Sequence, residues 1–152
     1  YALADLQAAP LDASTFYTGE IQGFGLFSLH GVPRKNFYAV KAFRQLLDTP
    51  VRLATRGEQP GRLALCAGTN ADRTEVRILL SHFKPAGDRI ELAVTGLPWD
   101  GPTLVETFLV DATHDLAKVR EFTVPAANLR IQEDTHAPSV HLVRLSKTPG
   151  TK

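Results

Sequence analysis

The sequence is poor in several features that would quickly narrow its class. It holds one cysteine, Cys66, and no methionine, and none of its apolar stretches approaches the ~20 residues that cross a bilayer. A single cysteine excludes an internal disulfide and any multi-cysteine metal site. Seventeen Lys and Arg stand against sixteen Asp and Glu, so the formal net charge is +1 and the excess of cations that nucleic-acid binding needs is missing. These features argue against a membrane-spanning protein, a nucleic-acid-binding protein and a disulfide-stabilised scaffold.

What the sequence does contain is the composition of a globular protein. Its 152 residues are 43% hydrophobic and 22% charged, which is enough for one substantial core. The chain has neither an initiator methionine nor a signal-peptide pattern, so we expect Tyr1 to begin a fragment or a processed product. Cys66 lies in the apolar run Leu63–Ala67, where we expect it to act as a small buried hydrophobe.

One segment has the periodicity of a helix. Between Lys35 and Leu47 the apolar positions follow a spacing of three and four residues, and they are Ala39, Ala42, Phe43, Leu46 and Leu47. Pro33 favours a helix start and Pro50 favours an end before Thr49. We expect the apolar stripe of this helix to pack on the following domain or on a partner chain.

The segments before this helix are less regular. Tyr1–Leu6 is apolar but too short to distinguish a strand from a helical turn. Gln7–Gly23 has the composition of a long loop, and Phe24–Leu29 is predicted to form a short strand.

After Pro50 the apolar residues alternate every second position. Turns rich in Gly, Pro, Asn and Asp separate the runs, which lie at 63–66, 76–80, 90–94, 104–110 and 140–145. Alternation of this kind is typical of antiparallel strands with one face on a core. The sequence therefore predicts a mainly β fold: residues 1–49 mixed α/β, 50–148 an antiparallel β-sandwich, and 149–152 a tail.

Four motifs, in order along the chain, resemble the C-terminal part of glycoside hydrolase family 39, which includes β-xylosidases and α-L-iduronidases. They are Tyr1-Ala-Leu-Ala-Asp5, Gly23-Phe-Gly-Leu26 with Gly31-Val-Pro33 and the following aromatic-rich helix, Val110-Asp-Ala-Thr-His114, and Ser139–Leu145. Arg34-Lys35-Asn36 departs from the Lys-Pro that the family often has after its turn. Related families with a barrel and a sandwich remain alternatives.

The resemblance implies which parts of a barrel this chain holds and where the catalytic residues lie. Residues 1–49 would be the last strand, loop and helix of a (β/α)₈ barrel, with Tyr1–Asp5 as the eighth strand. Retaining hydrolysis of an O-glycosidic bond needs two carboxyl groups about 5 Å apart. The family carries its two glutamates on strands that would precede Tyr1, so no catalytic residue is expected in this chain and the chain alone is expected to be inactive.

The resemblance also implies partners: a carbohydrate such as a xyloside or an exopolysaccharide, and the rest of the catalytic barrel. No cofactor and no metal are expected, and a secreted or periplasmic location is favoured.

Four residues are candidates for substrate contact. Asp5 would lie at the C-terminal end of a barrel strand, where barrel active sites gather, or would brace the next loop. Glu20, Phe24 and His30 would lie near the same cleft, although His30 fits a turn equally well and Phe24 fits a loop anchor.

Two other features have competing interpretations. Asp111 and His114 have a spacing compatible with metal binding, but without a second cluster we expect Asp111 to bond local backbone amides in a turn. Trp99 is the best single candidate for an exposed ring that stacks on a sugar, or it packs against the barrel. The first alternative leads to a rival hypothesis, a non-catalytic carbohydrate-binding module, and a structural domain without ligand is a third possibility.

Overall fold

The structure is a computed structural model that describes residues 1–148 except 8, 17, 22, 85, 86, 88, 126 and 127. The expected tail, 149–152, and most of the expected turn Pro85–Asp88 lie outside the described residues. The elements are α1 (Ala2–Leu6), α2 (Lys35–Arg44), the 3₁₀ helix η1 (Gln45–Asp48), β1 (Val51–Arg52), β2 (Leu63–Thr69), β3 (Glu75–His82), β4 (Arg89–Val94), β5 (Thr103–Val110), β6 (Asp115–Val124), β7 (Leu129–Asp134) and β8 (Ser139–Lys147).

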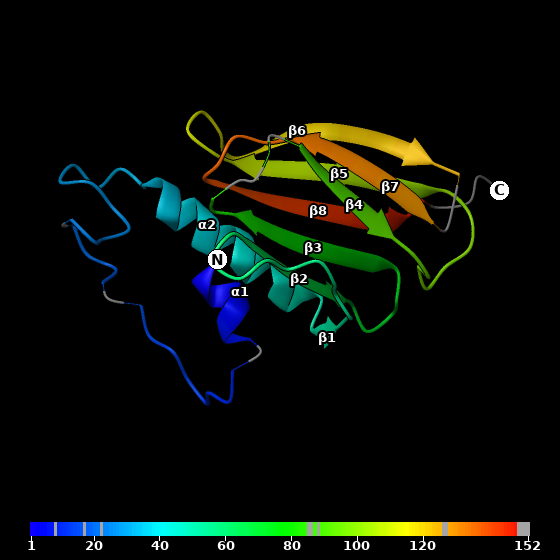
Figure 1. Cartoon of the computed structure of the whole chain (residues 1–152), viewed down its shortest axis with the longest axis horizontal. Coiled ribbons are helices and arrows are strands. Elements are labelled where there is room, and N and C mark those ends of the chain that lie inside the picture. The colour runs from blue at the N-terminus through cyan, green and yellow to red at the C-terminus, as the bar shows by residue number, and fades with distance from the viewer. Residues whose placement is uncertain are drawn as a thin grey trace.

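The strands form two antiparallel sheets that face each other (Figure 1). The larger sheet has six strands in the order β1-β2-β3-β8-β5-β6, and the smaller one pairs β4 with β7. Every paired neighbour runs antiparallel. The mainly β, antiparallel sandwich predicted from the two-residue alternation is confirmed.

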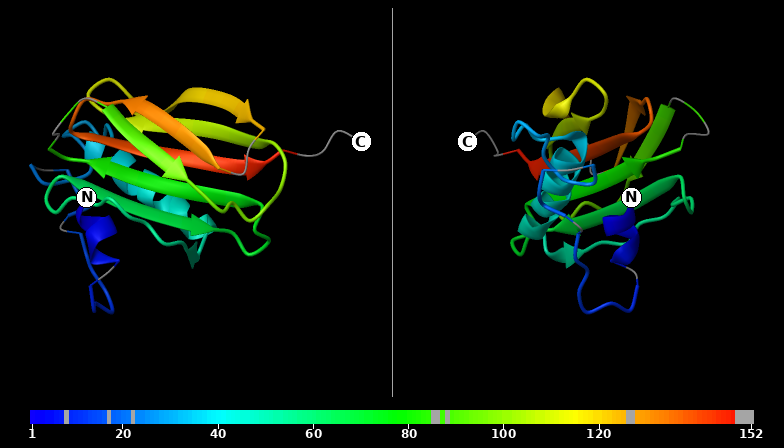
Figure 2. Two further views of the ribbon diagram at one scale, coloured as in Figure 1. Left: turned by 45° about the vertical axis from the view of Figure 1, so that its right-hand side comes forward. Right: turned by 90° about the vertical axis from the view of Figure 1, so that its left-hand side faces the viewer.

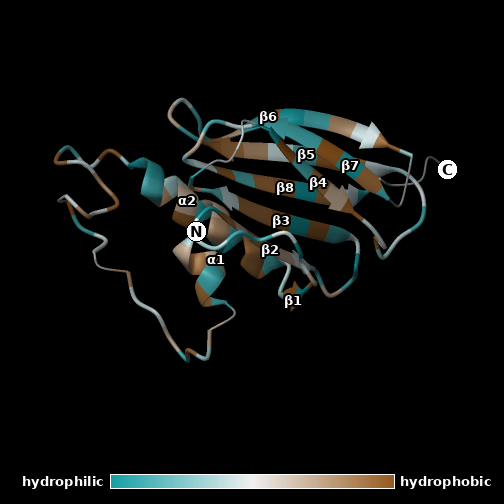
Figure 3. Cartoon of the chain, viewed as in Figure 1, coloured by the Kyte–Doolittle hydropathy of each residue, from teal (hydrophilic) through white to brown (hydrophobic). Residues whose placement is uncertain are grey.

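The six-stranded sheet is covered on both faces, which creates two apolar clusters. The first lies between the two sheets and is built on Val76, Ile78, Val105, Val143, Leu145, Leu129, Ile131 and Trp99. The second lies under the helices and is built on Ala4, Ala42, Ala64, Cys66, Leu79 and Leu142. The helices and the β4–β7 sheet therefore occupy opposite faces of the large sheet (Figure 2). Colouring by hydropathy shows apolar residues concentrated along its central strands (Figure 3).

The expected helix forms and packs on the large sheet as predicted. Ala42 is fully buried, and Phe43 and Leu46 pack against the second cluster. Leu47, by contrast, is 61% exposed, so its place in the apolar stripe is wrong. The cause is the change from α-helix to 3₁₀ helix at Gln45, because three residues per turn instead of 3.6 rotate later side chains away from the original face.

Three strands, β1, β6 and β7, were not predicted, and β1 has only two residues. β6 is an edge strand with mostly exposed residues, and its pairing with β5 is interrupted by register shifts at Thr107/Phe108 and Leu109/Val110. Such irregularities break the alternation on which the prediction depended. β7 has only two fully buried apolar residues, Leu129 and Ile131, which is too few for a pattern.

Two expected strands in the first 49 residues are absent. Tyr1–Asp5 lies in α1, where the carbonyl of Tyr1 accepts hydrogen bonds from the amides of Ala4 and Asp5 at 3.0 and 3.1 Å. Phe24–Leu29 contains only an isolated bridge partner, Phe27. A strand is stable only beside another strand, and no described strand pairs with either segment. The division into residues 1–49 and 50–148 as separate domains stays a prediction.

Candidate functional site

The most unusual surface of the chain is the arm, which we define as residues 9–33 between α1 and α2. Of ten large apolar side chains that are exposed in the described structure, six belong to the arm: Leu11, Phe16, Ile21, Phe24, Leu29 and Val32. Phe24 and Leu29 are 79% and 78% exposed. Figure 1 shows the arm extending away from both sheets. Concentration of apolar side chains on one segment is typical of a surface that another protein part covers.

The second half of the arm is held in place by bonds to the start of α2. Asn36 Nδ2 donates to the carbonyl of Gly25 at 3.1 Å, and Arg34 Nη1 donates to that of Gly23 at 3.1 Å. The rings of Phe27 and Phe37 lie 5.3 Å apart. These contacts fix the backbone on either side of Phe24 while its ring stays in water.

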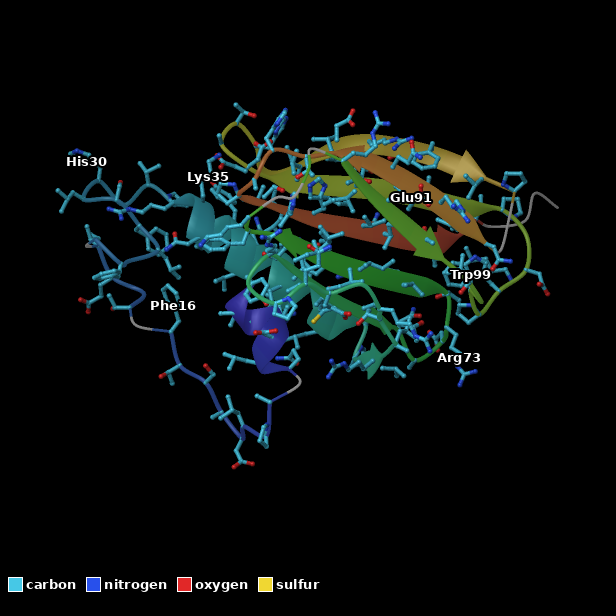
Figure 4. All side chains as sticks on the ribbon, viewed as in Figure 1. Phe16, His30, Lys35, Arg73, Glu91 and Trp99 are labelled. Carbon is cyan, nitrogen blue, oxygen red and sulfur yellow. The ribbon has the colours of Figure 1, made fainter. Side chains whose placement is uncertain are left out.

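The structure does not bring the four predicted site residues together. Asp5 is exposed on α1, while Glu20, Phe24 and His30 are exposed on the arm. The amide of Glu20 donates to Thr18 Oγ1, and the amide of His30 donates to Ser28 Oγ. Figure 4 shows His30 at the outer end of the arm. No hydrogen bond or ion pair links any two of these four described residues, so their role in substrate contact stays a prediction.

The helix is attached to the large sheet by ion pairs at both ends. At its start, Lys35 Nζ lies 2.6 Å from Asp115 Oδ1 and 3.1 Å from the carbonyl oxygen of His114. At its end, Arg77 on β3 donates to the carbonyl of Gln45 at 2.6 Å and to Asp48 at 2.5 Å. The bond from Arg77 holds the pKa of Asp48 below its usual value. The arm is thus connected to a helix with a fixed position on the sheet.

The loop between β5 and β6 contains the turn that the sequence predicted. Asp111 Oδ1 accepts from the amides of Thr113 and His114 at 2.8 and 2.7 Å and contacts the His114 ring at 2.9 Å. Burial alone would raise the pKa of Asp111, but the bonds from Thr113 and His114 outweigh it and lower the pKa to about 2. The turn interpretation is confirmed. In the described part of the chain, no group of three or more His, Cys, Asp or Glu is arranged to hold a metal ion.

A buried polar cluster between the sheets was missed by sequence reasoning. Thr135 Oγ1 lies 2.6 Å from Ser139 Oγ, 3.2 Å from His141 Nε2 and 3.3 Å from His82 Nδ1. His141 Nδ1 is buried without a hydrogen-bond partner among the described residues. Burial, and secondarily the charge of His82, lowers the pKa of His141 to about 4. No sequence signal links these residues, since His82 and Thr135 are 53 positions apart.

Trp99 and Cys66 are both internal. Trp99 is 6% exposed in the first cluster, and its Nε1 donates to Thr103 Oγ1 at 2.9 Å. The interpretation of Trp99 as an exposed sugar-stacking ring is therefore wrong, because a ring packed between two sheets cannot reach a ligand. Cys66 is buried and contacts the carbonyl of Ala4, as expected, and burial raises the pKa of its thiol.

Comparison with solved structures relates this architecture to known proteins. A glucosidase from Croceicoccus marinus superposes with a TM-score of 0.73 at 21% identity, over 84% of this chain and 34% of its own. A family 30 subfamily 8 xylanase from Clostridium acetobutylicum superposes with a TM-score of 0.72 at 12% identity, over 96% of this chain and 37% of its own. The chain shares its fold with the matching part of each of these two enzymes.

The likeness does not single out one family. A family 39 enzyme from Xanthomonas axonopodis pv. citri gives a TM-score of 0.57 at 15% identity, over 83% of this chain and 33% of its own. This value is lower than that of the family 30 xylanase. No protein-family model matches the sequence, and neither does the sequence of any curated protein. The chain spans about a third of the length of each of these three structures. No described helix has the length and apolar character to cross a membrane.

Proposed function

We propose that this chain is the C-terminal part of an enzyme that hydrolyses O-glycosidic bonds, with its sandwich serving as a structural accessory domain. The catalytic glutamates would lie on a (β/α)₈ barrel outside these residues. The proposal is supported by the fold shared with glycosidases three times as long and by the family 39-like motifs along the sequence. The substrates suggested by the motifs are xylosides or exopolysaccharides.

The observation that carries the proposal is the exposed apolar surface of the arm. Burying a large apolar side chain contributes about 1.5–3 kcal/mol. Six such side chains on the arm therefore represent roughly 10 kcal/mol of favourable contact with a covering body, before the costs of association. A barrel that packs against the arm and α2 would supply this cover and would place the arm at its rim.

The carboxylates near the arm do not form a catalytic pair by themselves. Asp5, Asp12 and Glu20 are exposed, and no described interaction joins them. Retaining hydrolysis needs an acid and a nucleophile about 5 Å apart on either side of the bond. We therefore expect the isolated chain to leave aryl β-xylosides and related aryl glycosides intact.

The test has two parts. First, the 152-residue protein is incubated with the aryl glycosides; turnover that disappears in Glu20→Gln would refute the assignment of catalysis to another segment. Second, the coding sequence upstream of Tyr1 is determined, and we expect it to encode βα units that contain all eight barrel strands, with two glutamates, because no described strand lies in residues 1–49. An upstream sequence without such units would refute the proposal.

The arm is tested in the longer polypeptide through paired substitutions. Phe24→Asp with Leu29→Asp should lower its thermal stability and its turnover, because two charges would replace buried ring and methyl groups. Phe83→Asp is the control, since Phe83 is also exposed, at 52%, but directly follows β3 and lies outside the arm. Equal effects of the arm and control substitutions would contradict the docking of the arm.

A further inference from the structure

A second incompletely covered surface is a groove between the two sheets. It has a volume of about 850 Å³ and lies between the inner faces of β2 and β3, the edge of β4, and residues 53–57, which follow β1. Its apolar walls include Leu53, Leu65, Ile78, Ile90, Leu92 and Val94. The groove is separate from the arm, which lies beyond the helices on the other face of the large sheet (Figure 2).

The groove exists because the smaller sheet is too narrow to cover the inner face of the larger one. Two strands, β4 and β7, face a sheet of six. On β7 the inward residues Leu129 and Ile131 are buried, at 7% and 1% exposure. On β4 the inward residues Ile90, Leu92 and Val94 are only half-buried. The loss of burial therefore appears where the next strand of the smaller sheet would lie.

The backbone of β4 points to the same position. Its residues pair with β7 along one edge, from Arg89 with Asp134 to Val94 with Leu129. Along the other edge, no backbone hydrogen bond joins β4 to another described residue. Alternate N–H and C=O groups of a strand point to each side, so half of those on β4 face the groove unpaired. An edge of this kind accepts an added strand.

The lining of the groove matches a peptide better than a sugar. None of the described residues that line it is aromatic, and the charged ones among them, Arg56, Arg73 and Glu91, are exposed residues at its margins. Figure 4 shows Glu91 on β4 and Arg73 in the turn between β2 and β3. Specific binding of a small polar ligand needs several convergent polar groups inside the pocket. Among the described residues that line the groove, the regular row of donors and acceptors is the backbone edge of β4 that does not face β7.

We propose that the groove receives an extended strand from the part of the enzyme outside these 152 residues, which pairs with β4 as the third strand of the smaller sheet. This inference rests on the proposed function, since it assigns the strand to the same enzyme. The strand alternates apolar residues, which fill the groove against Leu65 and Ile78, with polar residues facing water. Pairing with all six residues of β4 requires a segment of about 20 Å.

The experiment uses the 152-residue protein and a fluorescent peptide of about seven residues in which valine and threonine alternate. We expect saturable binding, with slowed hydrogen exchange at amides of residues 89–94. Leu92→Glu places a charge in the groove and should weaken binding about tenfold or more. Ala93→Glu is the matched control, because Ala93 is exposed on the outer face of the same strand and binding should persist.

A second, milder variant keeps the test valid if Leu92→Glu does not fold. Ile90→Thr keeps a β-branched residue at the mouth of the groove and should weaken binding by a smaller factor, with an unchanged circular dichroism spectrum. Absence of binding to the wild-type protein, or equal binding to all variants, would overturn the proposal. So would self-association that Leu92→Glu abolishes, since the occupant would then be a second copy. If the peptide binds but the upstream sequence encodes no barrel, the groove is still a strand-binding site, whereas the proposed function is refuted. The failure of one proposal can therefore be told apart from the failure of the other.

Discussion

Acidification should destabilise the protein through the buried polar cluster around His141. This side chain is 2% exposed, and its Nε2 contacts Thr135 and Ser139, while Nδ1 has no partner among the described residues. Protonating the ring would place a charge between the sheets, next to His82. The folded state therefore resists protonation, and the pKa of His141 falls from 6.5 to about 4.

The difference between the pKa of His141 in the unfolded and folded states sets the sign and the size of the change in stability with pH. Between pH 6.5 and about 4 the unfolded chain holds a proton on residue 141 that the folded chain does not, so stability rises with pH across this window. Each pH unit is worth about 1.4 kcal/mol, so the free energy of unfolding should fall by roughly 3 kcal/mol as the pH drops through the window. Asp111, whose pKa is lowered to about 2, contributes stability that is lost only as the pH falls below its unfolded value of about 3.9.

Urea unfolding at pH 7.0 and pH 4.5 measures this loss. With slopes of about 1–3 kcal/mol per molar, the midpoint should move by roughly 1–3 M for the wild-type protein. His141→Gln should show a much smaller shift, because it removes the titrating group and retains a hydrogen-bonding side chain. His30→Gln, on the exposed tip of the arm, should behave as the wild type. The same pH-dependent loss in the wild type and in His141→Gln would refute the reasoning.

Two further substitutions test the packing of the sheets. Gly68→Ala should destabilise the protein by about 1–3 kcal/mol in urea unfolding, because the added Cβ would lie 2.1 Å from the carbonyl oxygen of Thr49; Gly19→Ala, with open space around it, is the control and should change stability little. Trp99→Ala should cost about 3–5 kcal/mol, because it removes a ring from the first cluster. Xylan binding that disappears in a still-folded Trp99→Ala protein would contradict the internal position of this residue.

The periodicity of the sequence was sufficient for the larger strands and for the helix. Positions such as Val76 and Ile78 alternate with Arg77, and this pattern places one face of β3 on a core wherever the strand lies. The pattern failed where regular geometry failed: at η1, where Leu47 turned outward, and at β6, where register shifts interrupt the alternation. For Tyr1–Leu6 the pattern left strand and helix open, because six residues hold too little information, and the strand expected for Tyr1–Asp5 came from the family resemblance alone.

The candidate site was harder to predict from the sequence than the strands and the helix were. Asp5, Glu20, Phe24 and His30 were chosen for their place in a resemblance, and the structure leaves them apart on α1 and the arm. Trp99 was expected at the surface because it lies in a turn, yet the turn folds its ring between the sheets. The cluster of Thr135, Ser139 and His141 could not be found, because Thr135 lies outside the predicted strands.

The sequence alone determined part of the local structure: the strands with regular alternation, the helix that begins at Lys35, and which of their faces are apolar. Local structure follows from backbone sterics and side-chain spacing, which are properties of neighbouring residues. Only the tertiary structure decided what each apolar face meets. It placed α2 on the large sheet, left the arm and the β4 groove uncovered, and buried His141, because burial depends on contacts between residues far apart in the chain.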